Sequence, residues 1–259
     1  MKLPLYHVDA FTSRVFSGNP AGVVPLPSWI DDQALQSIAA ENNLPETAFF
    51  VGRAGKYDIR WLTPTTEVDL CGHATLASAF VLMSRLEPGL EAVEFSSRSG
   101  SLRVTRARDL YALDFPARPA RPVDLTGALQ AALGARPNEV WAARDLMAVF
   151  GTEEEVRALK PDLPLLSAYD TFAVLATAPG KSADFVSRFF APRQGIPEDP
   201  VTGSAHCTLV PYWSKRLGRT TLHAQQVSAR GGELFCEDRG ERVSIAGRAV
   251  LYLEGTIEV

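Results

Sequence analysis

An internal repeat is the sequence feature that most constrains how this chain can fold. Both halves of the 259 residues carry the same landmarks in the same order: a strand pattern ending at proline, a loop leading into glycine, an apolar stretch ending in Arg-Leu, and an arginine-containing turn. The paired landmarks are Pro64 and Pro192, Cys71 and Thr202, Arg85 and Arg216, and Arg98 and Arg230, at offsets of 128, 131, 131 and 132 residues. Chance rarely keeps four landmarks in register, so the repeat predicts two similar domains. The open alternative is that the two segments are unrelated and share the positions of proline and glycine by chance.

Each half has the pattern of a sheet around one helix. Residues 57–63 alternate between polar and apolar side chains, as in a half-buried strand, whereas residues 76–83 are apolar on almost every side. A helix without a polar face has to be surrounded, here by strands expected at residues 93–96, 102–106 and 110–115. In the second half the matching helix is predicted at residues 205–215, where Pro211 should kink it or end it early.

The domain boundary is predicted at the proline-rich stretch 115–122, which is extended and poor in backbone donors. This gives domains at residues 1–116 and 117–259, with a last strand at about residues 250–259 available to pair with the first domain. The predicted fold class is α+β: two similar domains, each with a curved, mostly antiparallel, barrel-like sheet around a central helix.

Two further helices are predicted at the periphery. Residues 31–42 follow a Ser28-x-x-Asp31 capping box. Residues 152–159 begin with Thr152 and three glutamates at the positive end of the helix dipole. We interpret this acidic run as a solvated face.

Composition and charge exclude several classes of partner. The 26 basic residues are outnumbered by 30 acidic ones, for a formal net charge of −4, so no electrostatic footprint for nucleic acid is present. No apolar run approaches the ~18 residues that suggest a membrane span. Residues 1–12 lack the apolar core of a signal peptide, so a cytoplasmic protein is expected.

The sequence offers no familiar metal or nucleotide site. Cys71, Cys207 and Cys236 form no CxxC pair, and the four histidines have no HxxxH or HExxH spacing. GxxxxGK[ST] and GxGxxG loops are also lacking, so we predict chemistry without a metal or a cofactor.

Both predicted central helices begin at a glycine followed by a polar residue, Gly72-His73 and Gly203-Ser204. Free backbone N–H groups and the positive end of the helix dipole gather at such starts, and glycine lets an anion approach the backbone. If the two starts face one another, they would hold a small carboxylate from both sides. The alternative is that these glycines only permit helix entry.

Glu46 is the candidate general acid or base. It lies where a helix has ended and the apolar strand 47–51 begins, and burial there would raise its pKa toward the working range. The repeat places Asp170 at the matching position, so an acid before this strand can also belong to the scaffold, and a surface glutamate is the plainer interpretation.

Three other side chains near the helix starts are chemically useful. Asp199 can touch a substrate or cap a helix. His73, kept neutral by the helix dipole, would suit hydrogen bonding. Cys71 invites a thiolate interpretation, but its counterpart in the repeat is Thr202, which argues against a mechanism with two thiols.

Five ordered motifs cover essentially the whole chain: Asp9-Ala-Phe-Thr12, Phe16-Ser-Gly-Asn-Pro-Ala-Gly-Val-Val24, Asn43-Leu-Pro-Glu-Thr-Ala48, Cys71-Gly-His-Ala-Thr75 and Glu198-Asp-Pro-Val-Thr-Gly-Ser-Ala205. Together they resemble the phenazine-biosynthesis PhzF-like family. The resemblance implies a diaminopimelate epimerase-like fold with the active site between two domains, usually in a homodimer. It also implies cofactor-independent isomerase chemistry on a small carboxylate substrate.

The resemblance further implies roles for single residues. Glu46 matches the acid/base that moves a proton between carbon atoms. The positions expected to orient the substrate or bind its carboxylate are His73, Asp199, Gly72, Gly203, Ser204 and Asn19. Related epimerases and racemases use two cysteines, whereas this chain is similar only at Cys71. The alternatives left open are a metabolite-binding or interaction protein without turnover, and a Cys71-dependent racemase or hydrolase.

Overall fold

The computed structural model describes residues 1–259, which divide into two compact units. Unit 1 consists of Met1–Asp114 together with Ala246–Val259, and unit 2 of Phe115–Ile245. Both are mixed α/β, with many strands and few helices. None of the helices is both long and apolar enough to cross a membrane.

Unit 1 is built on nine strands, in which antiparallel and parallel pairs alternate. Its strands are β1 (Lys2–Ala10), β2 (Asn19–Pro25), β3 (Glu46–Arg53), β4 (Lys56–Leu62), β5 (Glu67–Val68), β6 (Ala92–Ser97), β7 (Gly100–Ala107), β8 (Leu110–Pro116) and β18 (Ala249–Glu258). The pairs β1–β2, β3–β4 and β6–β7 are antiparallel, while β2–β3 and β4–β6 are parallel. Strand β5 pairs with β4, and β8 with β7.

Unit 2 repeats this alternation. Its strands are β9 (Arg121–Val123), β10 (Glu139–Ala142), β11 (Leu146–Val149), β12 (Val174–Pro179), β13 (Phe185–Ala191), β14 (Ile196–Asp199), β15 (Thr221–Gln226), β16 (Gly232–Asp238) and β17 (Arg242–Gly247). The pairs β10–β11, β12–β13 and β15–β16 are antiparallel, and β11–β12 and β13–β15 are parallel. The structure therefore repeats its pairing order as well as its sequence landmarks. Closure of either sheet into a barrel stays a prediction.

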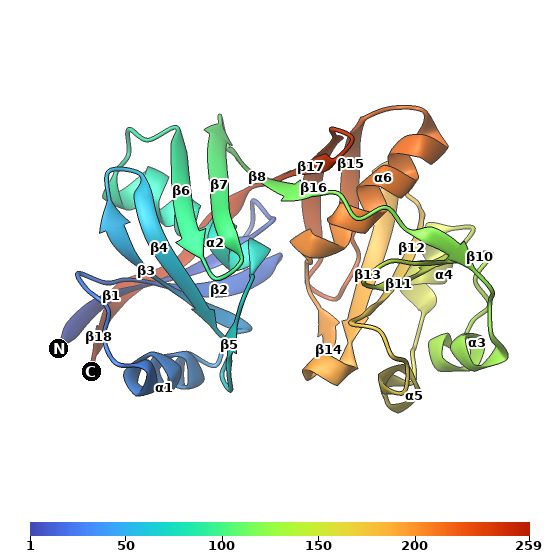
Figure 1. Cartoon of the computed structure of the whole chain (residues 1–259), viewed down its shortest axis with the longest axis horizontal. Coiled ribbons are helices and arrows are strands. Elements are labelled where there is room, and N and C mark those ends of the chain that lie inside the picture. The colour runs from blue at the N-terminus through green and yellow to red at the C-terminus, as the bar shows by residue number, and fades with distance from the viewer. The chain divides into compact units, whose positions relative to one another are not determined.

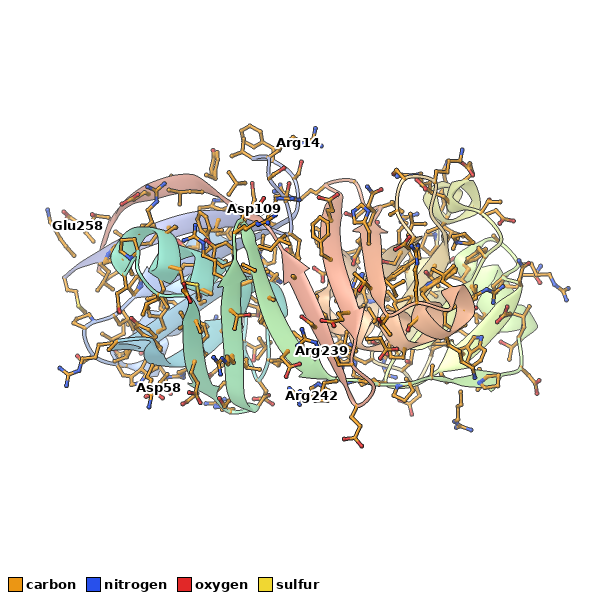
Figure 2. The ribbon with its side chains drawn as sticks, turned by 90° about the horizontal axis from the view of Figure 1, so that it is seen from above. Arg14, Asp58, Asp109, Arg239, Arg242 and Glu258 are labelled. Carbon is orange, nitrogen blue, oxygen red and sulfur yellow. The ribbon has the colours of Figure 1, made fainter.

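The last strand returns to the first. β18 pairs antiparallel with β1 along its length, and Val259 donates a backbone hydrogen bond to the Met1 carbonyl at 2.8 Å, so the two termini lie together in Figure 1. Asp109, labelled in Figure 2 on the turn between β7 and β8, accepts a hydrogen bond from Arg248 beside β18. Unit 1 is therefore assembled from both ends of the chain.

Helix α2 (Gly72–Val81) packs against β1, β2, β3, β7 and β18. All its residues from His73 to Ala79 are buried, as expected for a helix without a polar face. It continues into the short π-helix η1 (Leu82–Leu86). Helix α1 (Asp32–Asn42) covers β3 and β4 from outside, and its N-cap is Asp31, which accepts a hydrogen bond from the Ala34 N–H at 2.8 Å. The predicted cap box at Ser28 was therefore wrong.

In unit 2 the matching helix is α6 (His206–Leu217), which follows the 3-10 turn η3 (Gly203–Ala205). Pro211 does not end the helix early, which contradicts one of its two predicted effects, whereas the kink stays a prediction. Proline removes the N–H that would bond to the Cys207 carbonyl, but that carbonyl accepts the Arg118 N–H at 2.8 Å instead. The same contact shows that the predicted linker is tied to unit 2 rather than free.

The remaining helices of unit 2 are short: α3 (Gly127–Leu133), α4 (Glu153–Ala158), α5 (Leu163–Ser167) and the 3-10 turn η2 (Pro192–Gln194). Thr152 and Glu155 form a capping box on α4. The acidic run in the first turn of α4 is not simply solvated, because Glu153 is buried, accepts the Lys181 N–H at 2.9 Å and accepts a hydrogen bond from Arg157 Nε at 2.7 Å.

Candidate functional site

Glu46 is positioned by the end of α1 and the start of β3. Asn43 adopts a left-handed conformation, with φ of 47°, that ends the helix, and β3 then begins at Glu46, opposite Ala21 in the parallel pair with β2. The Glu46 side chain is only 12% exposed. Its counterpart in the repeat, Asp170, is fully exposed and forms an ion pair with Arg193. Asp170 lies in the bend before β12 rather than at the start of the strand, so the two acids differ in both position and burial.

Three predicted residues of unit 1 meet at the start of α2. Glu46 Oε2 lies 3.1 Å from His73 Nε2, and Asn19 Nδ2 lies 3.2 Å from His73 Nδ1. Cys71 Sγ lies 3.5 Å from the same Nδ1 and 3.9 Å from Nε2. The His73 imidazole is therefore held between a carboxylate, an amide and a thiol. Gly72, the first residue of α2, lies in the same turn.

The charges in this cluster differ from the expectation of a neutral His73. Burial lowers the pKa of the imidazole, but the neighbouring Cys71 sulfur and the Glu46 carboxylate raise it more, so its pKa lies well above the usual value. Burial raises the pKa of the Cys71 thiol, and Glu46 raises it further. The charged neighbours therefore favour the protonated form of the His73 imidazole.

The same cluster has the donor atoms of a metal site. One ligand atom from each of Glu46, Cys71 and His73 lies within 4.8 Å of the others. Although His73 Nε2 is within ion-pair distance, the buried Glu46 Oε2 accepts no hydrogen bond of good geometry. Sequence spacing could not reveal this set, because one ligand comes from a strand and two from a helix start.

In unit 2, Asp199 is held by a network of hydrogen bonds that the sequence did not predict. Thr202 Oγ1 donates to Asp199 Oδ2. The buried Gln226, at the end of β15, accepts the Thr202 N–H through Oε1 at 2.8 Å and donates to the Asp199 carbonyl at 2.7 Å. Gln226 Nε2 also donates to Thr202 Oγ1 at 3.2 Å. Because the Thr202 oxygen accepts this hydrogen bond, its own proton is available to the Asp199 carboxylate.

Ser204 contacts a cation that sequence reasoning missed. Arg144 Nη2 lies 3.3 Å from Ser204 Oγ, and the guanidinium is fixed by two hydrogen bonds to the buried Asp145, at 2.9 and 2.7 Å. Its carbon lies 4.2 Å from the ring centre of Phe172. The Arg144-Asp145 pair follows β10 with no motif to mark it, so only the folded chain brings it to Gly203 and Ser204.

The second helix start differs from the first. Gly203 begins the 3-10 turn η3, and α6 proper starts at His206, so the predicted pair of helix starts at glycine holds only for Gly72. His206 is fully buried, with Nδ1 at 2.9 Å from the Thr202 carbonyl. Burial lowers its pKa to about 4, so it is neutral near pH 7.

The other two cysteines are buried, and one hollow of unit 1 has none of the predicted residues in its lining. Cys207 and Cys236 are buried, and burial raises the pKa of both thiols, to about 11 for Cys207. A hollow of about 450 Å³ in unit 1 has none of the predicted site residues in its lining. It is lined by Trp29, Asp58, Ile59, Arg60, Ser96, Ser97 and Arg98.

Comparison with known proteins adds to this geometry. Residues 8–255 match the family described as phenazine biosynthesis-like protein. An uncharacterized isomerase of Pseudomonas aeruginosa is 50% identical over 259 residues, and the match covers 100% of both chains. A crystal structure of a phenazine biosynthesis protein of the PhzF family from Enterococcus faecalis has 48% identity and a TM-score of 0.98, over 100% of both chains. A hydroxyproline epimerase from Agrobacterium vitis, at 10% identity and a TM-score of 0.60 over 99% of this chain and 92% of that one, shares the fold alone.

Proposed function

The chain belongs to the phenazine biosynthesis-like family, and from this premise we propose that it is a cofactor-independent isomerase in which Glu46 moves a proton between carbon atoms of a small carboxylate substrate. Isomerase activity is supported by the names of its relatives. The observation that carries the more specific mechanism is the contact between the buried Glu46 and His73, 3.1 Å apart.

The proposed chemistry is a proton transfer without redox change. The Glu46 carboxylate takes a proton from a carbon next to the substrate's carboxylate, and the electron pair of the C–H bond enters the conjugated system. The same group then returns the proton to another carbon. A positioned general base contributes roughly 10²- to 10⁴-fold in rate. The positive charge on His73 would stabilise the developing enolate-like charge, an effect worth about 3 kcal/mol for a strong fixed donor.

The residues of unit 2 are proposed to hold the substrate. Gly203 and Ser204 offer backbone and hydroxyl donors to a carboxylate, and Arg144 adds a fixed positive charge beside them. Asp199, held by Thr202, would accept a hydrogen bond from the substrate. That these groups and Glu46 act on one substrate stays part of the proposal, as does the homodimer implied by the family, which light scattering would test.

Solvent exchange tests this function directly. A panel of small cyclic and amino carboxylates is incubated with the protein in D₂O, and deuterium incorporation is followed by proton NMR. Glu46→Gln should lower the exchange rate of the active compound by at least about 10²-fold, because it removes the base, while binding stays measurable. Asp170→Asn, at the matching position of the repeat, is the control and should exchange at the wild-type rate. Full exchange by Glu46→Gln would exclude Glu46 from the mechanism.

A Cys71-dependent racemase is the second candidate, favoured by the 3.5 Å contact between Cys71 Sγ and His73 Nδ1. Burial and Glu46 raise the pKa of this thiol, which disfavours a thiolate nucleophile or base. Cys71→Ser decides between the two: we expect exchange to persist within about tenfold, whereas its loss beyond 10²-fold would favour the cysteine mechanism.

A further inference from the structure

We propose that Glu46, Cys71 and His73 form a binding site for a thiophilic divalent cation of the Zn²⁺ type. The three residues come from two elements fixed in the core of unit 1, the start of β3 and the first turn of α2. Their side chains are largely buried, and their donor atoms already converge. The cation would bind the same atoms that the proposed isomerase chemistry uses.

The spacing of the donors fits a tetrahedral ion. With bonds of about 2.0 Å to nitrogen or oxygen and about 2.3 Å to sulfur, neighbouring ligands of such an ion lie roughly 3.3–3.8 Å apart. His73 Nε2 is 3.1 Å from Glu46 Oε2 and 3.9 Å from Cys71 Sγ. Both pairs that include His73 are thus near the spacing of a bound ion, and all three donor atoms lie within 4.8 Å of one another.

The chemistry of the set selects the class of cation. Thiolate and imidazole are ligands for zinc and cobalt, whereas magnesium and calcium prefer all-oxygen sites. The Glu46 Oε2 atom is buried and faces the cluster, with His73 Nε2 as its neighbour at 3.1 Å. Three protein ligands leave a fourth position for water or a substrate oxygen.

Binding of the cation would block the isomerase, a consequence that rests on the proposed function. A carboxylate oxygen bonded to Zn²⁺ cannot take a proton from carbon, and the imidazole would lose its positive charge when Nε2 binds metal. The site is therefore inhibitory, and a chelator should restore activity.

Cobalt spectroscopy of the full, untagged chain tests the site without knowledge of a substrate. We expect one Co²⁺ per chain, visible d–d bands of tetrahedral intensity, and a near-ultraviolet band from sulfur-to-cobalt charge transfer, all abolished by one equivalent of Zn²⁺. Cys71→Ser should lose the charge-transfer band, and Glu46→Gln should weaken binding at least tenfold. His223→Gln, which breaks the half-exposed His223–Glu233 pair at 2.8 Å, is the matched control and should bind as the wild type does.

Several results would overturn the proposal. A charge-transfer band that persists in Cys71→Ser places the metal on another cysteine, and equal affinity of Glu46→Gln and wild type removes the carboxylate from the site. Should Cys71→Ser fail to fold, mass spectrometry of the wild type decides: Zn²⁺ must slow alkylation of Cys71. In the exchange assay Zn²⁺ should stop turnover and EDTA should restore it. If none of the compounds is turned over, this contradicts the proposed isomerase function but not the metal site, because the cobalt spectrum reports metal binding without a substrate.

Discussion

Two buried histidines show how strongly the environment of a single residue decides its chemistry. His73 lies between a carboxylate and a thiol, and its pKa is raised well above the ordinary value although burial opposes this. His206 lies in the corresponding turn of unit 2, where burial against Phe185 lowers its pKa to about 4, although the hydrogen bond with the Thr202 carbonyl opposes this shift. His73 is therefore suited to carry a positive charge, whereas His206 stays neutral near pH 7 and forms a hydrogen bond with the Thr202 carbonyl.

His206 predicts acid sensitivity of the fold. Its pKa of about 4 in the folded state lies below the ordinary value of 6.5, so the unfolded chain binds the proton more tightly. Neutral His206 therefore makes its full contribution to the free energy of unfolding above about pH 6.5. This contribution falls by about 3 kcal/mol as the pH drops toward 4, because each unit of pKa difference corresponds to about 1.36 kcal/mol. This loss is measured by urea unfolding of the wild type and of His206→Gln at pH 7 and pH 4.5. His223→Gln is the control, and an unchanged pH slope in His206→Gln would contradict the prediction.

At the scale of elements, contacts with other segments decide what a local pattern becomes. Pro211 should have broken α6, yet the carbonyl that it leaves without a helical donor is bonded to Arg118 from the chain segment before β9. Helix continuity here depends on a partner nearly a hundred residues away, which no local propensity records.

This arrangement predicts a small effect of Pro211→Ala. A proline inside a helix normally costs about 3 kcal/mol relative to alanine. Because the Cys207 carbonyl already has a donor, we expect the alanine variant to gain no more than about 1 kcal/mol in the free energy of unfolding, by chemical denaturation. A gain near 3 kcal/mol would show that the Arg118 contact does not compensate.

The segment that carries Asp199 depends on the strand behind it. Gln226 makes three hydrogen bonds with Asp199 and Thr202, and its side chain is buried. Gln226→Leu keeps the volume but leaves the Thr202 N–H and the Asp199 carbonyl without these bonds, so we expect a loss of about 2–4 kcal/mol in unfolding free energy. Gln225→Leu, on the opposite face of β15, is the control, and we expect it to change stability by less than about 1 kcal/mol. An equal loss of unfolding free energy in both variants would show that the hydrogen bonds of Gln226 do not stabilise the segment that carries Asp199.

At the scale of the whole molecule, unit 1 is completed only by the end of the chain. β1 has β2 on one side and β18 on the other, and Ile257 of β18 packs on the apolar cluster that includes Leu3 and Phe49. Without β18, β1 becomes an unpaired edge. We therefore expect unit 1 to need β18 as well as residues 1–114 for its stability.

Fragments test this dependence. Residues 115–245 should unfold cooperatively by themselves, whereas residues 1–114 should not. A circular permutant that joins Val259 to Met1 and places residues 246–259 before 1–114 should restore a cooperative thermal transition, because the two termini already meet. The thermal transitions of the two fragments and the permutant are compared by circular dichroism. A fragment 1–114 as stable as the permutant would contradict the role of β18.

The sequence by itself determined the features that depend on local pattern and repetition. The offset between the halves, the mainly apolar helical stretch at residues 76–83 and the acid at the start of β3 follow from periodicity and turn chemistry, which act over a few residues. The family followed from ordered motifs.

Only the tertiary structure decided the contacts between distant segments. It placed Cys71 and Glu46 on the same imidazole and so set the charge of His73, brought Arg144 to Ser204, and supplied Arg118 to the helix that contains Pro211. Electrostatic and hydrogen-bond energies depend on distances in space and on burial, and neither quantity is defined until the strands have paired.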